Sequence, residues 1–298
     1  MAENDKHPAN PDLAKIRERI DEIDERIQSL INERARFAQQ VGLSKGKLAS
    51  AVEYYRPERE AEVLRAIQAR NEGPIRDDEM LRLFREIMSA CLAQQEPLKV
   101  GFLGPEGTFT QTAVYKHFGH SVRALPFHTI DEIFHEVESG VADFGVVPIE
   151  NSTEGSVNNT LDMFLTSPLK IAGEIELKIE QHLLGSETGL DKIERICAHE
   201  QSLAQCRSWL REYLPHAELI GMSSNAAGAR RARDEAGTAA NGPAVAADGY
   251  DLEVLVSNIE DRADNATRFL VIGRKLLAAS GSDKTTILVS TSDTGEGA

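Results

Sequence analysis

Cysteine is scarce in this sequence, and long apolar runs are absent from it. The three cysteines, Cys91, Cys197 and Cys206, lie far apart and match no metal-ligand spacing, so we expect reduced thiols in a cytoplasmic protein and no metal site. No apolar stretch approaches the length that crosses a bilayer, and the polar N-terminus lacks the apolar segment of a signal peptide. We therefore expect neither membrane insertion nor export.

Positive charge is also in short supply. The 298 residues carry 33 Lys and Arg against 48 Asp and Glu, which gives a formal net charge of -15. A protein that binds the phosphate backbone needs a basic surface, so this balance argues against a nucleic-acid partner. A small anionic substrate is still compatible, because it responds only to local charge. The length is enough for roughly two domains.

The first third of the chain has the pattern of helices. Between residues 12 and 41, apolar residues recur at alternating spacings of three and four, which predicts one helix about 45 Å long. Such a helix is too long to be covered by its own small domain, so we expect a partner helix. Two more helices are predicted to begin near Pro57 and Asp77, and a polar loop containing Lys45 and Lys47 is predicted after the first helix.

Three polar residues, Arg34, Glu60 and Gln95, interrupt the apolar stripes of these helices. An internal ion pair would explain one of them, but three in one small unit indicate a polar pocket inside a helical bundle. Arg17 lies roughly 25 Å from Arg34 along the same helix, so one small ligand cannot touch both in a single chain. An antiparallel two-fold dimer would bring Arg17 of one subunit towards Arg34 of the other.

Together with Lys45 and Arg59, these residues resemble the all-helical chorismate mutase family, which forms an intertwined homodimer. The resemblance implies that Arg34 and the arginine at position 17 of the neighbouring subunit hold the carboxylates of chorismate. The rearrangement needs no nucleophile, only a folded substrate and donors aimed at the developing charge. The resemblance implies four catalytic residues, Arg34, Lys45, Glu60 and Gln95, and two substrate-binding residues, Arg17 and Arg59.

Residues 97–278 alternate short apolar runs with helical segments, which predicts an α/β fold. The first run, residues 99–103, leads into a glycine-bearing turn at 104–110 that opens a helix, a place where backbone N–H groups bind a carboxylate or phosphate. Polar clusters lie at the ends of three later strands, at residues 150–156, 199–205 and 265–268. Open α/β sheets bind ligands at strand ends, although a capped turn would explain any one cluster.

Four of these motifs resemble prephenate dehydratases: Gly104-Pro105-Glu106-Gly107-Thr108-Phe109, Pro148-Ile149-Glu150-Asn151-Ser152 with Gly155, His199 with Gln201-Ser202, and Thr267-Arg268-Phe269. The domain order resembles the bifunctional chorismate mutase–prephenate dehydratases of phenylalanine biosynthesis. The resemblance implies two α/β lobes, similar to type II periplasmic binding proteins, with the active site in the cleft between them. It implies chorismate and prephenate as substrates and no cofactor.

The implied reaction removes a hydroxyl group and carbon dioxide from prephenate, so the site needs a proton donor and groups that hold two carboxylates. The resemblance implies Thr267 as the donor at the leaving group, and Glu150 is the second candidate. His199 is as compatible with a structural role as with a catalytic one. The residues implied to position the substrate are Thr108, Asn151, Ser152, Thr153, Gln201, Ser202 and Arg268.

The expected organisation is a disordered N-terminus at 1–11, the helical mutase domain at 12–96, the dehydratase domain at 97–278, and a tail at 279–298. Residues 284–290 alternate like the first strand of another domain. In relatives a phenylalanine-binding ACT domain follows at this point. We therefore expect the tail to be a linker and the first strand of that domain, disordered or loosely docked, and we expect phenylalanine not to inhibit this chain.

Two alternative functions are compatible with the same residues. In one, the helices only dimerise a prephenate dehydratase, because Arg56 and Cys91 stand where the mutase family has an acidic residue and a serine. In the other, the chain is a two-lobed protein that binds a small anion and carries a helical dimerisation arm. Turnover of chorismate separates the bifunctional enzyme from the anion-binding protein, and a mutase assay of residues 1–96 alone decides whether the helices are only a dimerisation unit.

Overall fold

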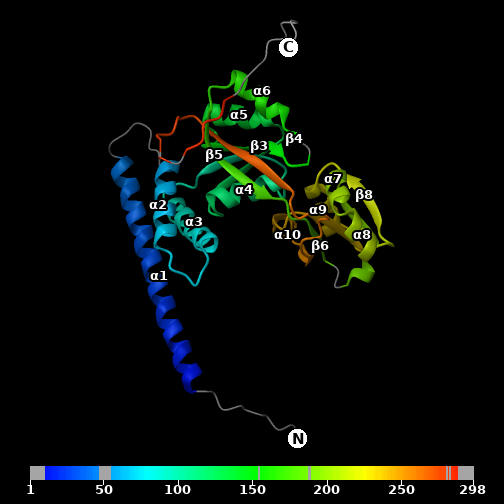
Figure 1. The fold of residues 1–298 in the computed structure, drawn as a ribbon, viewed down its shortest axis with the longest axis horizontal. Helices are drawn as coiled ribbons and strands as arrows, with labels where there is room; N and C mark the ends of the chain where they lie inside the picture. Colours follow the sequence, from blue (N-terminus) through cyan, green and yellow to red (C-terminus); the bar gives the residue numbers. More distant parts are fainter. Residues whose placement is uncertain are drawn as a thin grey trace, which may run out of the picture.

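The computed structural model describes residues 11–46, 55–153, 155–186, 189–279, 281 and 283–287. These residues form a unit of three helices and two α/β lobes, each built on its own sheet (Figure 1). The predicted combination of a helical unit with a two-lobed α/β unit is confirmed. Within these residues, none of the helices has the length and hydropathy needed to cross a membrane.

The helical unit consists of α1 (Pro11–Gly46), α2 (Pro57–Arg70) and α3 (Asp77–Ala93), and α3 packs against both other helices. Figure 1 shows α1 running far past α2 and α3 towards the N-terminus. Because little of the described chain covers it, the apolar stripe of α1 stays exposed, with each side chain at least 41% accessible to solvent. These residues, called the α1 stripe below, are Leu13, Ile16, Ile20, Ile23, Ile27, Leu30, Phe37 and Val41.

The end of α1 differs from the prediction. The helix continues to Gly46, so the backbone of Lys45 is helical and does not belong to a loop. No proline interrupts this stretch, and Ser44 Oγ donates to the carbonyl oxygen of Gln40, one turn back, at 2.8 Å. The side chain of Lys45 and the whole of Lys47 lie outside the described residues.

The first lobe is a mixed sheet with the order β2-β1-β3-β11-β5, and β4 pairs with β3. Strand β1 runs parallel to β2 and β3, whereas β11 runs antiparallel to β3 and β5. One face packs against α4, and the other packs against α5 and α6. The elements are β1 (Lys99–Leu103), α4 (Phe109–Phe118), β2 (Arg123–Phe127), α5 (Ile130–Ser139), β3 (Phe144–Asn151), β4 (Gly155–Ser156), α6 (Asn158–Thr166), β5 (Lys170–Lys178) and β11 (Ala266–Gly273).

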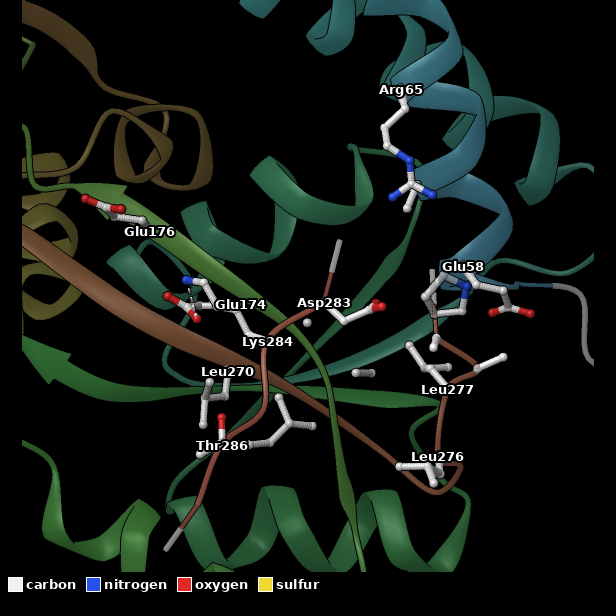
Figure 2. Close-up of a pocket in the computed structure, with 17 residues that line it drawn as sticks. Glu58, Arg65, Glu174, Glu176, Leu270, Leu276, Leu277, Asp283, Lys284 and Thr286 are labelled. Carbon is white, nitrogen blue, oxygen red and sulfur yellow. Dashed lines mark hydrogen bonds and ion pairs between the residues drawn. The ribbon is translucent and has the colours of Figure 1, made fainter. Parts of the chain in front are cut away.

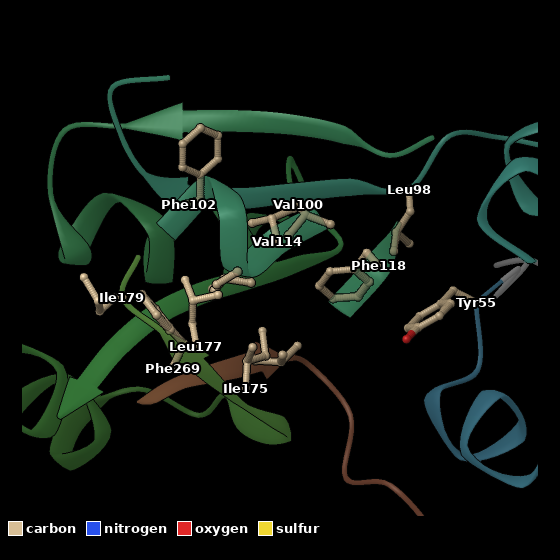
Figure 3. Packing of buried hydrophobic residues seen from close by; sticks show 13 residues of the cluster. Tyr55, Leu98, Val100, Phe102, Val114, Phe118, Ile175, Leu177, Ile179 and Phe269 are labelled. Carbon is tan, nitrogen blue, oxygen red and sulfur yellow. The ribbon is translucent and has the colours of Figure 1, made fainter. Parts of the chain in front are cut away.

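Tyr55 joins the helical unit to this lobe. Its ring packs against Phe118 and meets Phe144 edge-on, with ring centroids 5.6 and 5.4 Å apart. Figure 3 shows Tyr55 at the margin of the core that also contains Phe102, Val114 and other buried residues of β1, α4 and β5. The core therefore extends from the sheet to the start of α2.

The second lobe has the strand order β10-β6-β9-β7-β8. Strand β7 is parallel to β8 and β9, and β6 is antiparallel to β9 and β10. The elements are β6 (His182–Gly185), the 3₁₀ turn η1 (Leu190–Lys192), β7 (Arg195–His199), α7 (Glu200–Gln205), α8 (Arg207–Tyr213), β8 (Glu218–Met222), α9 (Asn225–Asp234), β9 (Thr238–Gly242), α10 (Val245–Tyr250) and β10 (Glu253–Val256).

Two segments connect the lobes, one between β5 and β6 and the other between β10 and β11. They are hydrogen bonded to each other, because Ile179 N donates to Asn265 O at 2.9 Å and Ile259 N donates to Gln181 O at 2.8 Å. The paired connectors form the floor between the lobes.

The tail runs back over the first lobe. Residues 283–287 have no regular secondary structure, so the described part of the predicted strand at 284–290 is not a strand. Instead Lys284 Nζ lies 3.0 Å from Glu174 Oε2 on β5. A hollow of about 690 Å³ lies between α2, β5 and this segment, and Figure 2 shows Lys284 reaching Glu174 across it. The rest of that predicted strand, and residues 1–10 at the other end, lie outside the described residues.

Candidate active sites

A cleft of about 390 Å³ lies between the two lobes. It is lined at the ends of β1, β3, β7 and β11, which carry the polar clusters picked out in the sequence. The clusters therefore converge, although they come from two different sheets. Five of the predicted residues line the cleft: Thr108, Asn151, Gln201, Ser202 and Thr267.

Thr267 is buried, with 9% of its surface accessible, and faces Asn151 across the pair of β3 and β11. Asn151 Nδ2 donates to Thr267 Oγ1 at 2.7 Å. The orientation of this amide is fixed, because its Oδ1 accepts from the backbone N–H of Thr153 at 2.9 Å. The hydroxyl oxygen of Thr267 thus accepts from the protein, and its proton is left to donate into the cleft.

Ser202 has the same arrangement on the opposite lobe. Its side chain is 5% accessible, and Oγ accepts from Asn225 Nδ2 at 2.9 Å and from Gln181 Nε2 at 3.2 Å. The Asn225 amide is in turn oriented by His199 N, which donates to its Oδ1 at 3.0 Å. Both lone pairs of Ser202 are occupied, so its hydroxyl proton is also left to donate into the cleft.

The turn after β1 contributes a helix N-terminus. Thr108 caps α4 by accepting from Gln111 N at 3.4 Å, and its hydroxyl donates to Leu103 O at 3.2 Å. Its side chain is thus committed to the turn, while Phe109 and Thr110 bring the first N–H groups of α4 to the cleft wall. These groups and the helix dipole favour an anion.

Glu150 and Arg268 do not reach the cleft. Each directly adjoins a cleft residue, but alternate residues of a strand point to opposite faces of the sheet. On the far face Arg268 Nη1 lies 2.6 Å from Glu150 Oε2, and its Nε lies 3.1 Å from Glu174 Oε1. Hydrogen bonds from Lys284 and then Arg268 hold the pKa of Glu174 below its usual range.

Ser152 and Thr153 are exposed and follow Asn151 without lining the cleft. Ser152 Oγ donates to Asn265 Oδ1 at 3.0 Å and accepts from Ala266 N at 3.0 Å, so it ties the turn after β3 to the start of β11. His199 also has a structural contact, because its Nδ1 accepts from Gln201 N at 3.4 Å and caps α7. These contacts hold the cluster together at the mouth of the cleft.

The predicted mutase residues are only partly assembled in one chain. Gln95 Nε2 donates to Ala38 O at 2.7 Å, which sets Gln95 one turn beyond Arg34 on α1, and both side chains are half-buried. Arg17 is exposed far along the same helix. The side chain of Lys45 lies outside the described residues.

Glu60 is engaged by Arg85 of α3 and by Tyr55. Its carboxylate lies 3.7 Å from Arg85 Nε and is hydrogen bonded to the Tyr55 hydroxyl. Burial raises the pKa of Glu60, and Arg85 and Tyr55 partly oppose this effect. Arg59 is exposed and pairs with Glu62 at 2.8 Å.

The sequence did not identify Gln181 and Asn225, which also line the cleft. Asn225 had a usable signal, because Ser223, Ser224 and Asn225 form a fourth polar cluster just past β8. Gln181 had none, since it lies in a short connector between two strands and belongs to none of the polar clusters. In the described part of the chain, no group of His, Cys, Asp and Glu side chains has the arrangement of a metal site.

Comparison with known proteins finds two families, each matching a different part of the chain. Residues 16–96 match the chorismate mutase type II family, and residues 100–276 match the prephenate dehydratase family. A bifunctional chorismate mutase/prephenate dehydratase from Stutzerimonas stutzeri is 54% identical over 283 residues, which cover 93% of this chain and 77% of that relative. A protein of the same description from Pseudomonas aeruginosa is 53% identical over 282 residues, with the same coverage.

Among solved structures, this chain is similar to a prephenate dehydratase from Arthrobacter aurescens in complex with L-Phe. The identity is 36% and the TM-score is 0.56, over 62% of this chain and 63% of the other. The likeness covers less than the whole chain, as expected when only the two α/β lobes correspond.

Proposed function

The chain belongs to the family of bifunctional chorismate mutase/prephenate dehydratases, and we propose that its inter-lobe cleft binds prephenate and its helical unit binds chorismate. It is an enzyme of phenylalanine biosynthesis that rearranges chorismate to prephenate and converts prephenate to phenylpyruvate. The proposals below concern the residues that carry out each step.

The contact between Asn151 and Thr267 carries the proposal for the cleft. In the reaction the electron pair of the bond to the departing carbon dioxide enters the ring, which becomes aromatic and expels the ring hydroxyl. The hydroxyl takes up a proton and leaves as water. Thr267 is oriented to donate to this group, because Asn151 occupies its oxygen, and a donor placed there stabilises the charge of the transition state.

Three groups in the cleft suit the carboxylates of the substrate. Ser202 presents its hydroxyl proton from the second lobe, and the N-terminus of α4 presents N–H groups from the first. Gln201 lies beside Ser202 in the lining of the cleft. We propose that Glu150 and Arg268 act indirectly, since their ion pair fixes the register of β3 and β11 and thus the contact between Asn151 and Thr267.

The variant Thr267→Ala tests this assignment in the intact chain. Phenylpyruvate formation is expected to fall at least about a hundredfold, while prephenate formation from chorismate stays at the level of the unmodified protein. Equal loss of both activities would mean that the substitution damages the fold, and full retention of phenylpyruvate formation would exclude Thr267 as the donor.

For the helical unit we propose a homodimer paired through the α1 stripe. Eight apolar side chains on one face of a single helix, each at least 41% exposed, form a seam that another helix would bury. An antiparallel partner would bring its Arg17 to the Arg34 and Gln95 of the first chain, where cationic and amide groups suit a dianion. Sedimentation velocity on the intact chain measures the predicted dimer directly.

Because Glu60 is engaged with Arg85 and Tyr55, a direct test of the catalytic helical unit against a helical unit that only dimerises is useful. The Thr267→Ala variant separates the two, since it blocks consumption of prephenate. Accumulation of prephenate from chorismate supports a catalytic helical unit, and unchanged chorismate supports a dimerisation unit.

The three cysteines are buried and unpaired, which suits our proposal of a reducing, cytoplasmic location.

A further inference from the structure

Gln181 occupies a constrained position at the floor of the cleft, on the connector between β5 and β6. Its backbone N–H donates to Glu260 Oε2 at 2.9 Å, and its carbonyl oxygen accepts from Ile259 N at 2.8 Å. Both partners belong to the second connector, so the backbone is held from both sides. The side chain lines the cleft and is only 1% accessible.

The side-chain amide of Gln181 has both N–H groups hydrogen bonded, but its oxygen is left without a partner among the described residues. Nε2 donates to Ser202 Oγ at 3.2 Å and to Gln205 Oε1 at 2.9 Å, which uses both of its hydrogens. Oε1 is buried and has no hydrogen-bond partner among the described residues. The reverse orientation would set the carbonyl oxygens of Gln181 and Gln205 against each other. A buried unpaired oxygen is unfavourable, so its retention points to a role for the two N–H groups.

That role follows from the state of Ser202. Asn225 alone would leave one lone pair of the serine oxygen open, and the hydroxyl could then turn its proton to a protein acceptor. Gln181 fills the second lone pair. We propose that Gln181 is a positioning residue for the dehydratase reaction, which locks the Ser202 hydroxyl as a donor to a carboxylate of prephenate. This inference rests on the proposed function of the cleft.

The double-mutant cycle of Gln181→Met and Ser202→Ala tests it on the intact chain, with prephenate as substrate. Gln181→Met is expected to raise KM about fivefold to tenfold with little change in kcat, and Ser202→Ala is expected to raise KM further. The double variant is expected to match Ser202→Ala alone, because Gln181 acts through the serine. Additive losses, or no effect of either substitution on KM, would overturn the inference.

Gln181→Glu provides a second, independent readout of nearly the same shape. A carboxylate at this position accepts from Ser202 and turns its proton away from the cleft, so KM is expected to rise more than in Gln181→Met. A purely packing role predicts the opposite order, because glutamate fits the site better than methionine does. Chorismate mutase activity reports on folding in every variant.

The result for Thr267→Ala separates this inference from the proposal beneath it. If that variant keeps its phenylpyruvate formation, the assignment of the cleft fails. If it loses the activity but the cycle is additive, only the role of Gln181 fails.

Discussion

The side-chain amide of Asn151 donates a 2.7 Å hydrogen bond to the hydroxyl oxygen of Thr267, across the antiparallel pair of β3 and β11. One residue further on, the same two strands place Glu150 and Arg268 in an ion pair on the opposite face. A single register therefore supplies a neutral, donating surface to the cleft and keeps the charged pair out of it. An anionic substrate then meets donors without a competing carboxylate.

Asn151→Asp is expected to lower the dehydratase kcat by about a hundredfold or more. The aspartate loses the N–H groups and accepts the proton of Thr267, so the threonine no longer donates to the leaving hydroxyl. The mutase rate is expected to be unchanged. Asn159→Asp is the matched control, because it adds the same charge at an exposed position on α6. A dehydratase loss as large in Asn159→Asp as in Asn151→Asp would show that charge alone is responsible.

The sequence predicted polar clusters at strand ends, but it could not show that they converge, because β3 and β11 belong to one sheet and β7 belongs to the other. It was also not sufficient to separate Thr267 from Arg268. The two are neighbours in one motif and face opposite sides of the sheet, and only the structure shows that Thr267 is the one facing the cleft. The contact between Gln95 and Ala38 likewise joins residues 57 positions apart, which periodicity cannot reveal.

The central strand of the second sheet, β9, could not be predicted from sequence patterns either. Strand β9, Thr238–Gly242, is fully buried but consists of small residues, so it carries little of the bulky apolar signal of a strand. Small residues are required here because α9 packs closely on the sheet. At Gly228 of α9, a Cβ atom would lie 2.2 Å from the carbonyl oxygen of Cys197.

Acid is expected to destabilise the fold through His117 of α4. Burial, together with the nearby charge of Arg85, lowers the pKa of His117 from 6.5 to about 4. Between these values the unfolded chain binds a proton that the folded chain does not, so the free energy of unfolding falls as the pH drops from about 6.5 to 4. The full shift in the pKa of His117 corresponds to up to about 3 kcal/mol of unfolding free energy.

His117→Met removes this contribution, so its thermal midpoint is expected to fall less between pH 7 and pH 4.5 than that of the unmodified chain. His128→Met alters an exposed histidine and serves as the control. Parallel losses of stability in the unmodified chain and His117→Met would argue against a neutral, half-buried imidazole.

Gly42→Ala is expected to impair the mutase selectively. A Cβ at Gly42 would lie 2.5 Å from Gln95 Oε1, so the end of the glutamine side chain has to move. That movement is inexpensive for the fold, and alanine favours the helix by about 1 kcal/mol. The thermal midpoint is thus expected to hold or rise, while the mutase kcat/KM falls about tenfold to a hundredfold.

The dehydratase rate measured on the same Gly42→Ala sample is expected to be unchanged. Gly249→Ala on α10 is the matched control, because nothing lies within 4 Å of the added carbon. An unaltered mutase rate in Gly42→Ala would exclude Gln95 from the chorismate site.

Complementation between two inactive variants tests the composition of the mutase site. In a dimer paired through the α1 stripe, each site takes Arg34 from one chain and the arginine at position 17 from the other. Arg17→Ala and Arg34→Ala are therefore each expected to abolish mutase activity in homodimers. A heterodimer of the two contains one site with both arginines and one site with neither, so it is expected to recover about half of the unmodified activity. Co-expression with two different affinity tags isolates it, and the dehydratase rate should be equal in all samples. If each site were built within one chain, the heterodimer would stay as inactive as its parents.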